Sequence, residues 1–256
     1  MSRYFMHLAY DGSDYRGWQI QPDEKTVQQT IENALSTLLS RKISLTGAGR
    51  TDTGVHASYF ITHFDLDPAE SNPGQQADLD PLTEQFVFKL NRFLPPDIVV
   101  YKIWQVLPDM HARFSAISRT YHYHISRVKP LYTRNYSLHV YGKLDTLEIA
   151  RCLEIIRSTV DFTSFSKLHT DVKTNDCRII DVQWKEEENA YLFEIKADRF
   201  LRNMVRSLVG TLLNVGQGKL DSEGFKKIVH AKDRSKAGQS APAWGLFLVH
   251  VAYGDI

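Results

Sequence analysis

The spacing of hydrophobic and polar positions changes repeatedly along this chain, and each spacing predicts one kind of element. Apolar residues recur at every second position from Tyr4 to Tyr10, as they do in a half-buried strand. A stripe at helical spacing follows, formed by Val27, Ile31, Leu35, Leu38 and Leu39. Because Thr26 and Gln29 have the spacing of a capping box, we predict that this helix begins directly after Thr26.

Strand and helix patterns continue to alternate through the rest of the chain. Strands are predicted at Ile43–Ala48, Ala57–Asp65, Ile98–Val106, Arg119–Ser126, Asp176–Trp184, Tyr191–Ala197 and Gly245–Tyr253. Further helices are predicted at Pro81–Phe93, Thr146–Arg157, Phe200–Val215 and Ser222–His230. Asp80 is the expected N-cap of the first of these helices, and the polar stretch Pro68–Asp80 before it is typical of a surface loop.

Both halves of the sequence contain strands together with at least two helices. This distribution predicts an α+β protein with two halves, 1–106 and 107–256, joined near Leu107–Arg113. Most connections are short, which favours antiparallel pairing.

Composition narrows the possible partners and surroundings. Lys and Arg number 31 against 30 Asp and Glu, so a polyanion would need basic groups gathered locally. The two cysteines, Cys152 and Cys177, lie far apart without a C-x-x-C pattern, which argues against a disulfide framework and a thiolate metal site. No stretch approaches the ~20 apolar residues of a membrane helix. We therefore expect a soluble, cytoplasmic protein.

One segment concentrates residues that can carry chemistry. Gly47–Ala57 contains three glycines, an arginine, an aspartate and a histidine between two predicted strands. Arg50 and Asp52, two residues apart, could both project into a cleft if the flanking strands hold the loop. A polar hairpin loop with its own ion pair is the simpler alternative. A phosphate-binding loop is disfavoured because the segment has no lysine and precedes a strand.

This segment resembles the signature of the tRNA pseudouridine synthase A family, and further motifs of that family follow in the same order. They are Tyr10–Ser13, Gly17–Gln19, His111–Ala116, Arg119–Tyr123, Asp161–Phe165, Phe200–Arg206 and Gly245–Val249. Thr53 stands where the family more often has alanine, and the departure touches no group with expected chemistry.

The resemblance implies a fold, a reaction and a partner. The implied fold is two ferredoxin-like halves that form one extended, mostly antiparallel sheet with a central cleft. The implied reaction is isomerisation of uridine to pseudouridine at positions 38, 39 and 40 of the tRNA anticodon stem-loop, by a homodimer without cofactor or metal. Whether the carboxylate attacks the sugar, adds to the base or removes a sugar proton stays open.

The resemblance also assigns roles to single residues. Asp52 is the expected catalytic carboxylate, and Arg206 is its expected partner, since a desolvated aspartate needs a nearby cation to stay ionised. Tyr121 is expected on the target base, Leu246 in the wall of the pocket, and Arg50 in the space that the flipped base leaves.

Other polar residues receive weaker predictions. Arg202 lies four residues before Arg206 on the predicted helix and is at most a phosphate contact. His122 and His124 lack further ligands at metal-binding spacing, and His56 is read as an orienting histidine. Candidate contacts to the RNA backbone, which the sequence does not rank, are Arg16, Lys25, Arg113, Arg119, Arg127, Lys129, Arg134 and Lys167.

Two other functions compete with this interpretation. A non-catalytic RNA-binding protein of the same fold would keep the basic and aromatic groups without needing Asp52. A hydrolase of N-glycosidic bonds would need a second acid or base to activate water, and no such pair is evident near Asp52.

Overall fold

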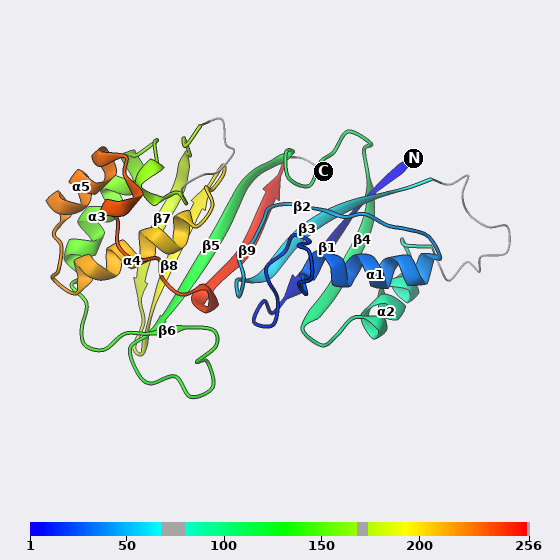
Figure 1. Ribbon diagram of the computed structural model, residues 1–256, viewed down its shortest axis with the longest axis horizontal. Coiled ribbons are helices and arrows are strands. Elements are labelled where there is room, and N and C mark those ends of the chain that lie inside the picture. Colours follow the sequence, from blue (N-terminus) through cyan, green and yellow to red (C-terminus); the bar gives the residue numbers. More distant parts are fainter. Residues whose placement is uncertain (68–79, 168–173, 255–256) are drawn as a thin grey trace. The chain divides into compact units, whose positions relative to one another are not determined.

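The computed structural model describes residues 1–67, 80–167 and 174–254, and the chain forms two compact units. The first unit comprises Met1–Ile117 together with Leu248–Ile256, and the second comprises Ser118–Phe247 (Figure 1). Except for Asp80, the predicted loop Pro68–Asp80 lies outside the described residues.

The first unit is a group of strands with two helices packed beside them. Its strands are β1 (Ser2–Tyr10), β2 (Thr46–Gly47), β3 (His56–Leu66), β4 (Ile98–Val106) and most of β9 (Leu246–Tyr253). β1 pairs antiparallel with both β3 and β4, and β9 lies beside β3. The helices are α1 (Val27–Leu39) and α2 (Glu84–Phe93), which contact each other. Figure 1 shows α1 and α2 side by side next to these strands.

The second unit repeats the mixture of strands and helices. Its strands are β5 (Ala116–Ser126, from Ser118 on), β6 (Leu138–His139), β7 (Ile179–Glu186) and β8 (Ala190–Ala197). β8 pairs antiparallel with both β5 and β7, whereas the short β6 runs parallel to β5. The helices are α3 (Thr146–Ser158), α4 (Met204–Gly216) and α5 (Ser222–Ala231). The predicted α+β class with mostly antiparallel strands is confirmed.

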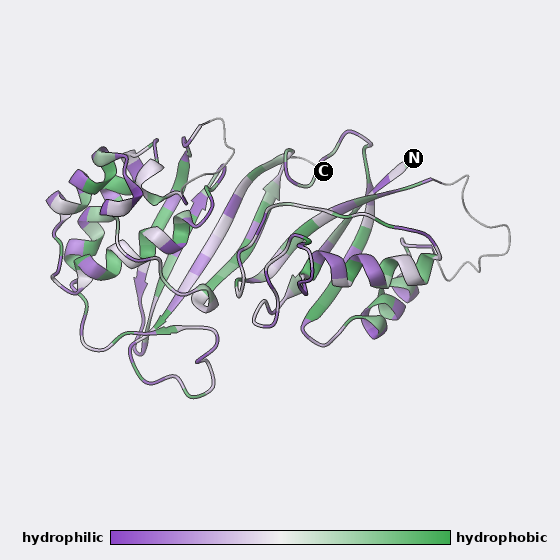
Figure 2. Ribbon diagram, viewed as in Figure 1, coloured by the Kyte–Doolittle hydropathy of each residue, from purple (hydrophilic) through white to green (hydrophobic). Residues whose placement is uncertain are grey.

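The core follows the pattern that predicted the elements. Hydrophobic and hydrophilic residues alternate within the strands and around the helices (Figure 2). Val27, Ile31 and Leu35 of α1 are fully buried, and Thr26 accepts a hydrogen bond from the amide of Gln29, so the predicted start of the helix after Thr26 is confirmed. Each fully buried side chain of this size contributes about 1.5–3 kcal/mol.

Both cysteines belong to the core of the second unit. Cys152 is fully buried on α3, and Cys177 is 1% exposed. Both are free thiols, in agreement with the prediction that they form no disulfide. Burial raises the pKa of each to about 12.

Two predicted boundaries in the first unit were wrong. In both cases side chains form hydrogen bonds with backbone groups that the pattern had assigned to a strand or to the start of a helix. The predicted strand Ile43–Ala48 pairs only at Thr46–Gly47, since the amide and carbonyl of Leu45 bond instead to Glu32 and Gln28 of α1. Asp80 was predicted to cap the second helix, but it caps a preceding turn through the amide of Leu82. Thr83 is the N-cap of α2.

A third predicted boundary was wrong in the second unit. The pattern Phe200–Val215 predicted one continuous helix, but α4 begins at Met204 after Asn203, whose φ of 68° is left-handed. Arg202 therefore precedes the helix, and its carbonyl accepts a hydrogen bond from the amide of Lys167. Arg202 and Arg206 do not lie one turn apart on a helix as predicted.

Candidate active site

The predicted catalytic loop, Gly47–Ala57, runs from β2 to β3 in the first unit and is held by its backbone. The carbonyl of Thr51 accepts a hydrogen bond from the amide of Trp18 at 3.3 Å, and the carbonyl of Asp52 accepts one from Val55 at 3.1 Å. The hydroxyls of Tyr10 and Thr51 lie 2.8 Å apart, and Thr51 is 7% exposed. These contacts fix the main chain on both sides of the Asp52 Cα.

Two glycines allow the segment after β1 to approach this loop closely. Gly17 has a φ of 89°, and a Cβ at this position would lie 2.4 Å from the carbonyl oxygen of Thr51. A Cβ on Gly12 would lie 2.0 Å from the carbonyl oxygen of Val55. No other residue fits in either place, because such approaches lie well inside van der Waals contact. The glycines of the family motifs Tyr10–Ser13 and Gly17–Gln19 thus have a steric explanation.

His56 anchors the far end of the loop. Its ring is 1% exposed, and its Nδ1 lies 3.1 Å from the amide nitrogen of Gly12 and 3.0 Å from Oδ1 of Asp11. One nitrogen bonds to only one of these groups at a time, and in either tautomer the ring is tied to the turn after β1. This placement agrees with the predicted orienting role.

The two charged residues of the loop differ in exposure. Arg50 is exposed, Asp52 is half-buried, and Thr51 between them points into the protein. The arrangement places one carboxylate at a defined position with reduced access to water. Such a group can act as a nucleophile or as a base.

The remaining predicted site residues belong to the second unit. Arg206 is on the first turn of α4, and its Nε donates a hydrogen bond to the carbonyl of Ala241 at 2.8 Å. The amide of Ala241 donates in return to the carbonyl of Arg206 at 2.9 Å. The chain can lie this close to α4 because Gly210 has no side chain: a Cβ there would lie 1.8 Å from the carbonyl oxygen of Gln239. The plane of the guanidinium is therefore set by the backbone.

Tyr121 and Tyr123 lie two residues apart on β5, as predicted, but their surroundings differ. Tyr123 is fully buried and donates a hydrogen bond to the carbonyl of Pro242 at 2.8 Å. Burial raises the pKa of Tyr123, and the positive charge of Arg206 partly opposes that shift, so the two side chains are within electrostatic reach. Tyr121 is half-buried and packs edge-on against Phe200, with 5.0 Å between ring centroids.

Leu246, the predicted apolar wall residue, opens β9 and is 6% exposed. The glycine before it lies against the ring of Tyr123, where a Cβ on Gly245 would come within 2.8 Å of a ring carbon. The second unit thus brings Arg206, Tyr123 and the chain from Ala241 to Leu246 together. Asp52 and Arg50 share the loop of the first unit.

Two residues that position the site were not predicted to do so from the sequence. Tyr10 was given as the end of a strand and the start of a family motif, without a role, yet its hydroxyl lies 2.8 Å from that of Thr51, and Ala241 received no prediction. A glycine inside an apolar helix, such as Gly210, signals that another backbone comes close, and it was the available clue to Ala241.

The basic residues that were predicted to contact the RNA backbone fall into two groups. Several cations are engaged within the protein: Arg16 with Glu24 at 3.1 Å, Lys25 with Asp97 at 3.9 Å, and Arg127 with Glu186 at 2.9 Å. Arg119 donates to the carbonyl of Asp198 at 3.0 Å. Lys129 and Arg134, in contrast, form no ion pair with any residue that the structure describes.

The described ranges contain neither a metal-binding cluster nor a membrane-spanning helix. His122 lies 2.7 Å from Glu194, and no group of three or more His, Cys, Asp or Glu side chains in these ranges could hold a metal ion. None of the helices there is both long and apolar enough to cross a bilayer.

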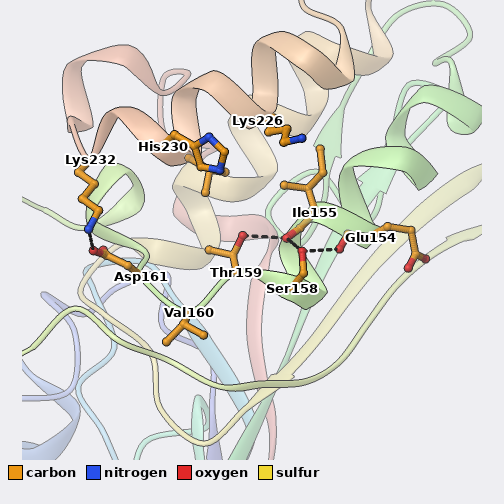
Figure 3. A pocket seen from close by; sticks show the side chains of 10 residues that line it. Glu154, Ile155, Ser158, Thr159, Val160, Asp161, Lys226, His230 and Lys232 are labelled. Atoms are coloured by element: carbon orange, nitrogen blue, oxygen red, sulfur yellow. Dashed lines mark hydrogen bonds and ion pairs between the residues drawn. The ribbon is translucent and has the colours of Figure 1, made fainter.

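A pocket of about 480 Å³ lies between the end of α3 and α5, and none of the predicted site residues lines it (Figure 3). Several of its polar groups are bonded to their neighbours. Lys232 pairs with Asp161 at 2.8 Å, and the hydroxyls of Ser158 and Thr159 donate to the carbonyl of Ile155.

Comparisons with known proteins give the same family as the motifs. The model of a family described as tRNA pseudouridine synthase matches residues 159–254. The tRNA pseudouridine synthase A of Bacteroides thetaiotaomicron is 52% identical over 258 residues, covering 100% of this chain and 92% of the relative. That of Bacteroides fragilis is 50% identical, covering 99% and 97%. That of Bacillus pumilus is 36% identical, covering 97% and 98%.

Proposed function

Because the chain belongs to the tRNA pseudouridine synthase A family, and is an isomerase, we propose that it converts uridine to pseudouridine at positions 38, 39 and 40 of the tRNA anticodon stem-loop. Asp52 is the proposed catalytic carboxylate. The observation that carries this assignment is the loop around Asp52, whose backbone is held by Trp18 and Val55 while its carboxylate stays half-buried.

The reaction demands little more than one well-placed carboxylate. The bond between C1′ and N1 breaks, the base turns, and C1′ joins C5, while C5 loses its proton and N1 gains one, either directly or by exchange with solvent. The reaction is redox-neutral. Attack on the sugar, addition to the base and removal of a sugar proton all use an ionised aspartate, and all are compatible with Asp52.

Arg206 is the proposed partner that keeps Asp52 ionised once substrate has displaced water. A carboxylate that loses water becomes harder to ionise unless a cation compensates. The hydrogen bond from Nε of Arg206 to Ala241 supports this role, because it holds the guanidinium plane before substrate arrives. Arg206 is a positioning and electrostatic residue in this scheme.

The other residues are assigned to recognition of the base. A uridine within a stem is reachable only when flipped out, and the flipped base needs a flat apolar surface. We assign that surface to Tyr121, which is supported against Phe200, and the pocket wall to Leu246. Exposed Arg50 is assigned to the space that the base leaves. Each of the halves 1–106 and 107–256 then supplies part of the site, and a cytoplasmic homodimer is the proposed form.

The decisive experiment compares the parent protein with Asp52→Asn on an unmodified tRNA transcript with uridines at 38, 39 and 40. We expect position-specific pseudouridine from the parent and a loss on the order of 10³-fold or more in the variant, with tRNA affinity kept. Asp23→Asn is the matched control, because Asp23 is exposed and its φ of 57° is tolerated by asparagine.

The other outcomes identify the competing functions. Two inactive proteins that both bind tRNA would point to a non-catalytic binding protein. Release of free uracil would point to a hydrolase.

A further inference from the structure

The segment Arg127–Lys143, between β5 and α3, has an unusual composition. It contains no aspartate or glutamate, although the whole chain is nearly neutral. Its charged and aromatic residues are Arg127, Lys129, Tyr132, Arg134, Tyr136, His139, Tyr141 and Lys143. Figure 1 shows the segment as the loop around β6, extending beyond the end of β5.

The base of this segment has a defined structure. β6 pairs with the end of β5, and the amide of Val140 donates to the carbonyl of Ser126 at 3.0 Å. Val140 and Leu144 are 6% and 2% exposed, and the next amide, that of Asp145, bonds to the carbonyl of Gly216. The segment is therefore part of the folded second unit rather than a loose linker.

Two of its three tyrosines, in contrast, face solvent. Tyr132 is 89% exposed and Tyr141 is 84% exposed, with the ring of His139 4.3 Å from that of Tyr141. A ring that is exposed to this degree gains almost nothing from packing within its own chain. Neighbouring exposed aromatic and apolar groups, here with Leu131 at 64%, are typical of a surface that binds another molecule.

The cations of the segment are of two kinds. Arg127 pairs with Glu186 and lies over the ring of Tyr191, so it is engaged in the fold. Lys129, Arg134 and Lys143 are exposed and form no ion pair with the described residues of the chain. Together they form the local positive surface that a chain of net charge +1 needs in order to bind a polyanion.

We propose that Arg127–Lys143 is a second RNA-binding site, which takes a loop of unpaired nucleotides from the same tRNA that enters the active site. Tyr132 and Tyr141 stack on unpaired bases, and Lys129, Arg134 and Lys143 contact phosphates. This inference rests on the proposed function for the identity of the RNA. A second copy of the chain is the disfavoured occupant, because a contact of this segment with its own copy across a two-fold axis would bring together two basic segments that contain no aspartate or glutamate.

The test measures equilibrium binding of unmodified tRNA in the Asp52→Asn background, so that no turnover is required. One variant removes charge (Lys129→Gln, Arg134→Gln and Lys143→Gln), one removes rings (Tyr132→Ala and Tyr141→Ala), and one keeps them (Tyr132→Phe and Tyr141→Phe). The matched charge control is Lys219→Gln, Lys226→Gln and Lys227→Gln, which removes three exposed lysines elsewhere in the same unit.

We expect the charge variant to raise Kd about tenfold and to lower the slope of log Kd against log salt by about 2, since each phosphate contact contributes ~0.7–0.9. The alanine variant should raise Kd about fivefold or more and the phenylalanine variant should not, because phenylalanine retains the stacking surface. Restoring Asp52 should leave kcat at saturating tRNA within about twofold of the parent.

Three results with these variants would overturn the proposal. The first is a Kd for tRNA in the charge and alanine variants that equals that of the parent. The second is a loss of tRNA affinity in the lysine control as large as in the charge variant. A change of oligomeric mass that accounts for the whole loss of affinity is the third, and it would assign the surface to a second copy. Photocrosslinking of the unaltered protein to tRNA is independent of folding defects. A nucleotide on Tyr132 or Tyr141 is expected, and its absence from both also overturns the proposal.

If the parent makes no pseudouridine but these binding results hold, the proposed function fails and the RNA site stands. If the parent is active and the binding results fail, only the second site is lost.

Discussion

The loop Gly47–Ala57 and the segment Arg127–Lys143 both place charged side chains at the surface, and they are built in opposite ways. In the loop, the backbone on either side of Asp52 is bonded to other segments, and glycines bring those segments into contact. In the segment, the base pairs with β5, whereas the tip has local hydrogen bonds, such as that from the amide of Tyr136 to the carbonyl of Thr133, and the residues from Val128 to Asn135 are largely exposed.

The difference matches what each region is proposed to do. A carboxylate that reacts at one carbon atom must be held within a fraction of an ångström, and rigidity must come from the main chain. Contacts to phosphates and base faces tolerate variation in geometry, because Coulomb attraction is long-ranged and every base has a flat face. The rigid loop is thus the region proposed to react with the substrate, and the exposed tip of the segment is the region proposed to bind RNA.

The sharpest way to break this comparison is to add one methyl group to a glycine that contacts the loop and to a glycine within the segment. Gly17→Ala places a Cβ 2.4 Å from the Thr51 carbonyl oxygen at a φ of 89°, so the loop must move. We expect pseudouridine formation to fall about 100-fold and the free energy of unfolding to fall by about 1–3 kcal/mol. Single-turnover rates and urea melts measure the two effects.

The paired change is Gly142→Ala in the segment Arg127–Lys143. Gly142 also has a positive φ, 81°, but no atom outside its neighbours lies within 4 Å of the added Cβ. Only the backbone cost of about 1–2 kcal/mol is expected, with activity within about threefold of the parent. Equal losses of activity in the two variants would show that the loop is no more sensitive to displacement than the segment.

A smaller effect is expected from Thr51→Val, which removes the hydrogen bond between Tyr10 and Thr51 without changing side-chain volume. The loop should lose about 1 kcal/mol of stabilisation, and activity should fall about tenfold as the Asp52 position becomes less defined. Thr53→Val, at the exposed neighbouring threonine, is the control and should leave activity unchanged. An unaffected Thr51→Val enzyme would show that glycine contacts alone hold the loop.

The last prediction concerns the pH dependence of stability, and it arises in the strand that follows the loop. His63 on β3 accepts a hydrogen bond from the amide of Ala112 through Nδ1, at 3.1 Å. Burial, followed by the charges of Arg3 and His111, lowers the pKa of His63 to about 4. Between pH 6.5 and 4 the unfolded chain therefore binds a proton that the folded chain excludes, and stability falls as pH falls through that window.

The expected contribution of His63 to this fall is roughly 2 kcal/mol. His63→Asn keeps an acceptor near the Nδ1 position and does not titrate, so the curve of unfolding free energy against pH should become shallower. It should not become flat, because burial also lowers the pKa of His7 and of His111. A curve of parental steepness in denaturant melts at pH 7.5, 6, 5 and 4 would contradict the assignment.

Elements whose signals are local were predicted well. The N-cap at Thr26, the strand Ile98–Val106 and the helix beginning at Thr146 all lie where the pattern placed them, because a cap or a run of alternating residues is contained within a few positions. The boundaries that were wrong depend on residues distant in sequence. Leu45 bonds to side chains of α1 instead of a strand, and a left-handed Asn203 delays α4.

The candidate site divides in the same way. Asp52 is conspicuous in the sequence because its loop combines glycines with charged residues. The residue pattern alone was compatible with several functions, and the family resemblance supplied the specific role of Asp52. The contacts that hold the site are not contained in any short motif. The pairing of Arg206 with Ala241 joins positions 35 residues apart, and that of Tyr10 with Thr51 joins positions 41 apart.

The burial of both cysteines makes this protein a convenient background for site-specific spectroscopy. A thiol with a pKa near 12 that is also shielded from solvent reacts very slowly with maleimides at neutral pH. A single cysteine introduced at exposed Thr133 would then be labelled selectively, without replacing Cys152 or Cys177. The emission of a fluorophore at that position would follow the binding and dissociation of RNA at the segment Arg127–Lys143 in real time.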